Sequence, residues 1–287
     1  MSEIAASLAE HIATWPAEHV VVGVSDRSRN RWLATNSGTE VDRPFPLASV
    51  TKALFSLAVL VAIEEGSVSL DEPAGPPGST VRHLLSHASG LGPDLADDGG
   101  LRTVARPGVR RLYSNAGFVV LGRLLTERTG IDHRQYFRES VVEPLGLTDT
   151  ILHGSPAAEA TSTVPDLLLV ANELLEPTLI HPSTLATATS AQFGELAGVL
   201  PGFGRQVPNP WGLGFELRGG KDPHWTAAEN SPGTFGHFGR SGTMFWVDPV
   251  AGIGLVALTD QPFGPWAADA WPAVSHWVLG AHESNGP

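Results

Sequence analysis

The segment from Ala48 to Glu65 constrains the fold of this chain most strongly, because it is apolar around nearly the whole circumference of a helix. It stops at Gly66, a residue type that commonly ends helices in the left-handed conformation. A helix without a polar face has to be covered on every side. We therefore predict a buried central helix, and a chain of 287 residues with 42% hydrophobic content is long enough to surround it.

The two ends of the chain are rich in β-branched and aromatic residues. We predict two hairpins there, each with two strands joined by a polar turn: residues 19–24 with 31–35, and residues 243–247 with 253–258. Trp211–Arg218 is predicted to add another strand. Short links join antiparallel strands, so we expect an antiparallel sheet, with a helix over residues 262–280 covering one face.

The middle of the chain carries helical patterns separated by Pro- and Gly-containing stretches. The predicted helices are Thr80–His87, Ala116–Arg128, His133–Val142 and Val164–Leu175, and residues 198–210 are expected to form a connection. We therefore assign the chain to the α+β class, with an antiparallel sheet flanked by helices and an inserted all-helical region. In this division residues 1–66 and 205–287 form a discontinuous sheet domain, and residues 67–204 form the inserted helical domain.

Composition excludes several classes of function. A net charge of −12 and a pI near 5.3 oppose binding to a phosphate backbone, so we expect no nucleic-acid partner. Cysteine is absent, which leaves no disulfide, thiolate metal site or cysteine nucleophile. Any catalysis by this chain has to use oxygen or nitrogen chemistry.

The first fifteen residues place Glu3 and Glu10 among Ala, Ile and Leu, without the basic start and apolar core of a secretory signal. We predict an amphipathic helix there. The longest apolar stretch, Ala53–Ile63, is too short to cross a bilayer. We therefore expect a cytoplasmic protein with no membrane partner, and the sequence leaves its oligomeric state open.

Ser49 and Lys52 lie at the head of the predicted central helix. Lysine and arginine together number 18, and only Lys52 and Lys221 are lysine. A desolvated lysine amine can lose its proton and act as a base, whereas arginine stays protonated. Residues three apart on a helix face each other, so the Lys52 amine can activate the Ser49 hydroxyl as a nucleophile. The alternative is that Ser49 caps the helix and Lys52 extends to solvent.

A second segment, Tyr113-Ser114-Asn115, directly precedes the predicted helix that starts at Ala116. A phenol near a lysine ammonium ionises more easily and can relay a proton. The Asn115 amide can hydrogen-bond a substrate carbonyl or the lysine. The alternative is that Ser114 or Asn115 is an ordinary helix cap and that Tyr113 packs in the core.

A third segment, Gly236–Gly242, precedes the predicted strand that begins at Thr243. Its glycines let a strand backbone approach a ligand closely, and an exposed edge N–H would complete an oxyanion hole. Glycine beside a strand also marks turns and bulges, so this segment alone leaves both interpretations open.

Together these segments resemble the motifs of the serine β-lactamase and penicillin-binding-protein superfamily, specifically its class C β-lactamase-like branch with the family VIII esterases. The resemblance rests on Ser49–Lys52, Tyr113–Asn115 and His237–Gly239, supported by Thr80–Leu91 and Trp211–Phe215. It extends over nearly the whole chain. It implies the fold of that superfamily and an acyl-enzyme mechanism.

The resemblance also implies roles for individual residues. Ser49 would be the nucleophile, Lys52 its base, and Tyr113 would assist proton transfer to the leaving group. No cofactor and no catalytic metal is implied, and His83 and His87 are not expected to bind a metal although they are four residues apart.

The remaining site residues are implied in the same way. The backbone N–H groups of Ser49 and Arg240 would form the oxyanion hole, and Asn115 would orient the acyl group. His237 and Gly239, from the third segment, would border the substrate.

The third segment departs from the family pattern. β-Lactamases and transpeptidases usually carry Lys-Thr-Gly there, whereas this chain has His237-Phe238-Gly239, with neither the cation nor the small hydroxyl. A neutral imidazole and a bulky ring should weaken binding of an anionic β-lactam or peptide terminus, although Arg240 would restore a positive charge nearby. We therefore expect a serine hydrolase that acts as an esterase on small carboxylic esters.

Other functions stay open. A β-lactamase or a D-amino-acid peptidase or carboxypeptidase would use the same mechanism on an amide, and an acyltransferase would pass the acyl group to another acceptor. A non-catalytic binding or assembly module is disfavoured because Ser49, Lys52 and Tyr113 are all intact. Each catalytic alternative has a small-molecule ester or amide as its partner.

Overall fold

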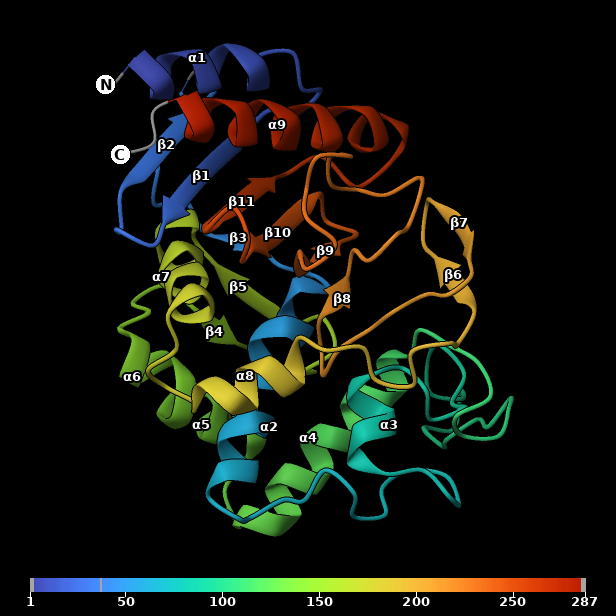
Figure 1. Ribbon diagram of the computed structural model, residues 1–287. Helices are drawn as coiled ribbons and strands as arrows, with labels where there is room; N and C mark the ends of the chain where they lie inside the picture. The colour runs from blue at the N-terminus through green and yellow to red at the C-terminus, as the bar shows by residue number, and fades with distance from the viewer. Residues whose placement is uncertain (1–2, 37, 285–287) are drawn as a thin grey trace.

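A six-stranded antiparallel sheet forms one layer of the molecule (Figure 1). The computed structural model describes residues 3–36 and 38–284. In spatial order the strands are β2 (Arg31–Thr35), β1 (Val20–Asp26), β11 (Ile253–Thr259), β10 (Thr243–Asp248), β9 (Phe235–Gly239) and β8 (Glu216–Leu217). Both predicted hairpins are present, and they join where β1 pairs with β11, with Val20 opposite Thr259.

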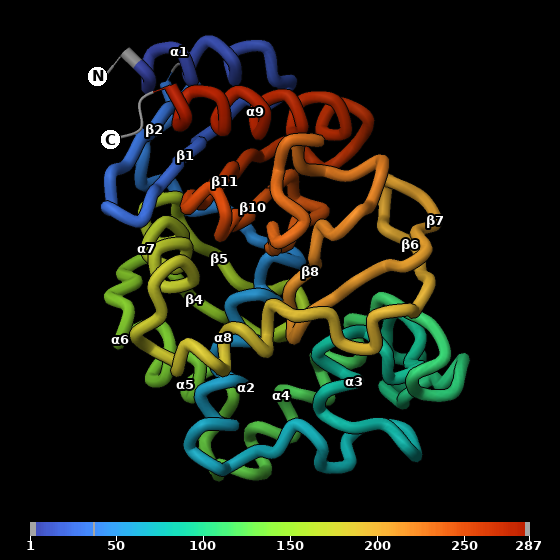
Figure 2. Tube along the Cα trace, in the orientation of Figure 1, coloured from blue at the N-terminus to red at the C-terminus, as the bar shows by residue number. Residues whose placement is uncertain are grey.

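Helices cover both faces of this sheet. On one face α1 (Glu3–Ile12) and α9 (Pro265–Ser284) lie side by side (Figure 2). Both terminal helices were predicted, but only the C-terminal one was expected to cover the sheet. On the other face α7 (Val164–Leu175) packs against β1 and β11. Successive side chains of β1 point to opposite faces of the sheet. Val22 therefore joins the apolar cluster of α1 and α9, while Val21 joins the cluster of α7.

The predicted central helix is α2 (Val50–Glu64). Apart from three residues near its C-terminal end, the whole helix is buried. It contacts β9 and β10 on one side and α4 and α5 on the other, so it lies between the sheet and the helical region. Gly66 follows it with a left-handed φ of 78°, as its position after the apolar segment predicts.

The helical region lies on the far side of α2 from the sheet (Figure 1). Its elements are α3 (Val81–Leu85), α4 (Asn115–Thr129), α5 (His133–Phe137), the π-helical turn η1 (Arg138–Val142), α6 (Glu143–Leu145) and α8 (Pro182–Ala188). The α+β class with an antiparallel sheet is confirmed. α7 lies within the predicted helical domain of residues 67–204, but it packs on the sheet. The division into two domains at residues 66 and 205 stays a prediction. Among the described residues, no helix combines the length and the apolar character needed to span a membrane.

Several short elements were not predicted. β3 (Phe45–Pro46), β5 (Ala160–Ser162) and β4 (Ile151–Leu152) form a second sheet, and β6 (Gly198–Leu200) pairs with β7 (Gly204–Gln206) inside the expected connection. Strands of two or three residues are too short to show a two-residue period in the sequence.

Two predicted elements are shorter in the structure. Of the predicted strand Trp211–Arg218 only β8 joins the sheet, because the chain turns back so that Trp211 forms an isolated bridge with Glu216. The predicted helix Thr80–His87 ends at Leu85, since His87 adopts a left-handed φ of 56°.

Candidate active site

Ser49 immediately precedes α2, and its side chain makes no capping hydrogen bond. Its Oγ lies 3.2 Å from the Lys52 Nζ, one helical turn along the chain. Lys52 is fully buried, so it does not extend to solvent. The structure therefore rules out the alternative in which Ser49 is only a cap and Lys52 only a surface cation.

The Lys52 amine lies among acceptors from three segments. Nζ is 2.7 Å from the Asn115 Oδ1 and 2.6 Å from the Ala157 carbonyl oxygen, besides its contact with Ser49. Burial lowers the pKa of Lys52 to about 7, and the nearby charge of Asp94 limits this fall. At neutral pH a large share of the Lys52 side chains is therefore uncharged.

Tyr113 directly precedes Ser114, the N-cap of α4, and its side chain lies in the same site as Ser49 and Lys52. Its hydroxyl lies 3.4 Å from the His237 Nε2, and it is near enough to the Ser49 side chain for Ser49 to lower its pKa slightly. Burial raises the pKa of Tyr113 well above its usual value. The prediction that a neighbouring ammonium would ease ionisation of this phenol is therefore wrong, because burial disfavours the charged phenolate and the carboxylate of Asp94 adds to this effect.

Ser114 is the N-cap of α4, and its hydroxyl accepts a hydrogen bond from the Gly117 N–H at 3.1 Å. The cap alternative thus holds for Ser114, and it places Asn115 at the first position of the helix. The Asn115 Nδ2 donates to the Asp94 Oδ1 at 2.8 Å, which leaves its Oδ1 directed at Lys52. A carboxylate, an amide and an amine therefore form one hydrogen-bonded chain.

Gly239 allows β9 to approach the turn before α2. A Cβ at this position would overlap the Leu47 carbonyl oxygen and the Thr243 Oγ1. Thr243 Oγ1 also donates to the Leu47 carbonyl oxygen at 2.9 Å, and Ser241 Oγ donates to the Pro46 carbonyl oxygen at 2.7 Å. These contacts fix the end of β9 beside Ser49.

Two backbone amides, those of Ser49 and Arg240, directly follow the residues that meet in this contact, Ala48 and Gly239. Within the described part of the chain, the N–H groups of Ser49 and Arg240 donate to no other protein group. Ala48, between Leu47 and Ser49, adopts a left-handed φ of 45°, an unfavourable conformation for a residue with a side chain. This geometry can serve an oxyanion, since free N–H groups at a strained turn are typical of such sites.

His237 is buried in β9 between Tyr113 and Trp211. Its Nδ1 lies 2.7 Å from the Phe238 carbonyl oxygen, which can only accept, so Nδ1 carries the proton. Burial, together with the charge of Lys52, lowers the pKa of His237 to about 3. The imidazole is therefore uncharged at neutral pH, and its Nε2 lone pair is directed at Tyr113.

These residues open onto a cavity of about 590 Å³. Ser49, Tyr113, Asn115, His237 and Arg240 all line it, and Arg240 is exposed at its edge. The structure thus brings the predicted site residues together, with Lys52 and Gly239 buried directly behind the surface of the cavity.

The lining also includes Trp211 and Phe238, which belong to segments that carry the resemblance. Other lining residues were not found from the sequence: Ala48, Asp94, Ala158, Leu200, Pro201, Gly202, Glu216 and Phe263. Three of them, Leu200 to Gly202, lie in the β6–β7 hairpin, which has no pattern that predicts proximity to Ser49. Asp94 follows shortly after the Thr80–Leu91 segment, and this spacing was the only available signal for it.

The second lysine of the chain is also buried, behind the cavity wall. Lys221 Nζ donates to the Glu216 Oε1, and it contacts the Leu217 carbonyl oxygen at 2.6 Å. Glu216 Oε2 accepts from the His224 Nε2 and the Trp225 Nε1, both at 3.0 Å. Although burial alone would raise the pKa of Glu216, Lys221 and His224 lower it to about 2. Both Glu216 oxygens are therefore occupied, and its charge is balanced inside the protein.

His83 and His87 make separate local contacts. His83 Nδ1 lies 2.9 Å from the Thr80 Oγ1, and His87 Nδ1 accepts from the Ser114 N–H at 3.1 Å. These bonds support the turn before α3 and the start of α4, and they place no ligand atom of the two rings in a common site.

The arrangement of serine, lysine and tyrosine around one cavity coincides with a match to a family model. The model described as Beta-lactamase matches residues 11–276, which is most of the chain. The chain belongs to the beta-lactamase family. The crystal structure of a beta-lactamase from Mycobacterium bovis is 49% identical, has a TM-score of 0.90, and aligns with 96% of this chain and 99% of that one.

Curated relatives match more weakly. Penicillin-binding protein 4* of Bacillus subtilis is 27% identical over 160 residues, which cover 46% of this chain and 34% of the relative. ML-236A carboxylate methylbutanoyltransferase of Penicillium citrinum is 29% identical over 158 residues, with 38% of each chain covered. The chain spans little more than a third of the length of these two relatives, so the similarity does not by itself transfer their activities.

Proposed function

We propose that this protein is a serine esterase that acylates Ser49 with a small carboxylic ester and releases the acid by hydrolysis. One observation carries the proposal: the Ser49 hydroxyl lies 3.2 Å from the amine of Lys52, whose pKa is about 7. An amine with this pKa is available as a general base at neutral pH. The family membership supports a hydrolase of the serine type.

Lys52 acts as the base in the acylation step. A neutral amine has two N–H bonds and one lone pair, and the Asn115 and Ala157 oxygens accept the two N–H groups. The lone pair is thereby left for the Ser49 proton. Ionised Tyr113 is disfavoured as the base, because its phenol keeps its proton at neutral pH.

The Ser49 oxygen forms a bond to the ester carbonyl carbon while its proton moves to Lys52. The negative charge that develops on the carbonyl oxygen is stabilised by the N–H groups of Ser49 and Arg240. Asn115 holds Lys52 and offers its second Nδ2 hydrogen to the acyl group.

Collapse of this adduct breaks the bond to the alcohol oxygen, which then needs a proton. Tyr113 donates it, because its hydroxyl is protonated and lies next to Ser49, and the Lys52 ammonium replaces the proton that Tyr113 has lost. In the second half of the reaction Lys52 takes a proton from water, which attacks the acyl carbon. The bond between the acyl carbon and the Ser49 oxygen then breaks, the acid leaves, and the Lys52 ammonium returns the proton to Ser49.

The preference for esters over β-lactams rests on charge. The position that is usually a lysine in β-lactamases is His237, with a pKa of about 3, and the neighbouring Phe238 also lines the cavity. Asp94 places a carboxylate on the same cavity, which opposes the positive charge of Arg240. A neutral ester meets no such repulsion, and Phe263 offers an apolar surface for its carbon chain.

An acyltransferase is the second candidate, because one of the relatives is a methylbutanoyltransferase. It would form the same acyl-enzyme and pass the acyl group to an alcohol instead of water. Product analysis in the presence of a competing alcohol distinguishes the two, since a transferase yields mainly the new ester.

A fluorophosphonate probe and two substrates test the proposal. We expect one adduct by intact mass on the wild type and none on Ser49→Ala, and faster turnover of a short-chain p-nitrophenyl ester than of a chromogenic cephalosporin. A wild type without an adduct, or an undiminished adduct on Ser49→Ala, would refute catalysis by Ser49. Faster cephalosporin turnover would leave the mechanism intact and make the protein a β-lactamase.

A further inference from the structure

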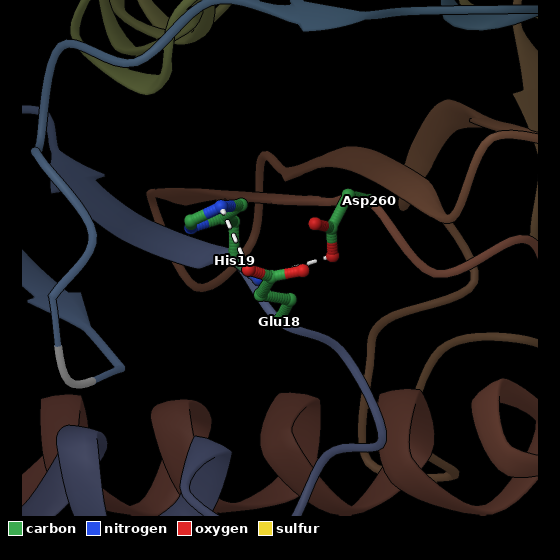
Figure 3. Close-up of side chains that lie close together, drawn as sticks. All are labelled: Glu18, His19 and Asp260. Carbon is green, nitrogen blue, oxygen red and sulfur yellow. Dashed lines mark hydrogen bonds and ion pairs between the residues drawn. The ribbon is translucent and has the colours of Figure 1, made fainter.

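Glu18, His19 and Asp260 gather at one end of the sheet, where β1 begins and β11 has just ended (Figure 3). One ligand atom from each residue lies within 4.8 Å of the other two. None of the three lines the cavity around Ser49. They therefore form a group separate from the candidate active site.

The hydrogen bonds around Asn36 determine the orientation of its side chain. Its Nδ2 donates to the carbonyl oxygens of Ala17 and Glu18, at 3.2 and 2.9 Å. Its Oδ1 accepts from the Val20 N–H at 2.9 Å. If the amide were reversed, its oxygen would face the carbonyl oxygens of Ala17 and Glu18, and its nitrogen would face the Val20 N–H. The atom that faces Thr39 is therefore the acceptor Oδ1.

The orientation of Asn36 determines what the Thr39 hydroxyl donates to, and thereby which ring nitrogen of His19 carries a proton. The only hydroxyl proton of Thr39 is donated to the Asn36 Oδ1 at 2.6 Å. At its 3.1 Å contact with the His19 Nδ1, the Thr39 oxygen must therefore accept, and Nδ1 carries a proton. In the neutral imidazole the lone pair is then on Nε2, which is 3.8 Å from the Glu18 Oε1.

A lone pair that faces a carboxylate is unfavourable, so this arrangement needs either a second proton on the ring or a metal cation between the two groups. The distance of 3.8 Å is too long for a hydrogen bond and close to the separation of two ligands of one metal. With metal–nitrogen and metal–oxygen bonds of about 2.0–2.2 Å, tetrahedral ligand atoms lie roughly 3.4 Å apart.

We propose that Glu18, His19 and Asp260 bind a divalent transition-metal ion of the Zn²⁺ type. Imidazole nitrogen with carboxylate oxygen suits Zn²⁺ and disfavours Ca²⁺ and Mg²⁺, which prefer oxygen alone. The Asp260 carboxylate is held in place by the backbone N–H of His19, which donates to Oδ1 at 3.0 Å. The Glu18 side chain is 85% exposed, so it can turn to complete the site.

This site would act on stability and not on the Ser49 chemistry. His19 and Asp260 lie just outside the terminal pair of β1 and β11, in which Val20 is opposite Thr259. A metal bound to both joins the two strand ends in the folded chain only, and binding therefore favours the folded state. The expectation that the chain binds no metal concerned the catalytic site, and this site lies apart from it.

Titration of metal-free protein with ZnCl₂ in a non-chelating buffer at pH 7.5, followed by calorimetry, tests the site. We expect one Zn²⁺ per chain with micromolar Kd, and a Tm that rises with ZnCl₂ and falls back with EDTA. His19→Gln should weaken Kd at least tenfold. His276→Gln is the matched control, because His276 Nδ1 lies 3.1 Å from Glu229 Oε2 on an exposed face without a third ligand among the described residues.

The proposal is overturned if binding does not saturate below 1 mM, or if His19→Gln binds as tightly as the wild type. It is also overturned if His276→Gln abolishes the binding. Glu18→Gln provides a second variant, because among the described residues the exposed Glu18 side chain has no hydrogen bond or ion pair outside this site. It should weaken Kd without lowering the Tm of the metal-free protein. An ordinary ion pair of His19 with Glu18 would instead leave the Tm independent of ZnCl₂.

Discussion

Replacing Asp94 by Asn should shift the pH dependence of catalysis, because it changes charge while keeping shape. Asparagine retains an Oδ1 that can accept from the Asn115 Nδ2, as Asp94 does at 2.8 Å. Asn115 in turn accepts from the Lys52 Nζ at 2.7 Å. The substitution therefore preserves the hydrogen-bonded chain and removes the negative charge that raises the pKa of Lys52.

The size of the shift follows from the geometry. Two hydrogen bonds and an amide group separate the carboxylate from the amine by about 7 Å, and Asp94 is exposed. At an effective dielectric constant of about 50, which allows for screening by solvent, the interaction is worth about 1 kcal/mol. This lowers the pKa of Lys52 and makes loss of its proton roughly fivefold more favourable.

The neutral amine is the active form, so a lower pKa moves the acidic limb of the kcat/KM profile to lower pH. At pH 6 the Asp94→Asn protein should be roughly fourfold more active than the wild type, and at pH 9 about equally active. Asp97→Asn is the control, since it removes an exposed carboxylate from the same loop without touching the cavity lining. An acidic limb that stays in place or moves to higher pH would refute the proposed coupling.

Three further substitutions test neighbouring parts of the account. Lys52→Arg should lower kcat/KM at least 100-fold with the protein still folded by circular dichroism, because guanidinium cannot accept the Ser49 proton, and substantial residual turnover would contradict the base role. Gly239→Ala should lower both kcat and Tm, because the added Cβ overlaps the Leu47 carbonyl oxygen, and the free energy of unfolding should fall by about 1–3 kcal/mol. Gly220→Ala is the control, since its Cβ meets no atom within 4 Å and should change neither quantity. The folded-state pKa of Lys52, about 7, lies below its ordinary value of 10.5, so the unfolded chain binds more protons between these values and stability rises with pH there. Lys52→Met should therefore be more stable than the wild type at pH 7 in urea titrations, with a difference that shrinks toward pH 10.5; a difference independent of pH would show that burial does not lower this pKa.

The sequence predicts the framework of the site because its signals are local. An all-round apolar helix, two hairpins and three short motifs are each readable within about 15 residues, and each restricts its neighbourhood. Gly239 illustrates this, since a glycine beside a strand indicates close approach, and the approach to Leu47 is what the structure contains.

The parts that could not be predicted depend on distant segments. Asp94 and the β6–β7 hairpin line the cavity only because the chain folds back over Ser49. The pKa of Tyr113 depends on burial by residues from several elements, and the sequence suggested the opposite direction because it considers only the neighbouring lysine. Lys221 shows the same limit. Lysine is scarce in this chain, but only the fold reveals that the partner of Lys221 is Glu216.

The central claim is that a buried Lys52 amine, with a pKa of about 7, activates Ser49. The rate at which a fluorophosphonate labels the protein between pH 5 and pH 9, followed by intact mass, measures this activation without reference to any substrate. The account predicts a labelling rate that is half-maximal near pH 7 and labelling that is absent in Ser49→Ala. A rate independent of pH, or one that rises only above pH 9 as for an ordinary lysine or a tyrosine, would contradict it.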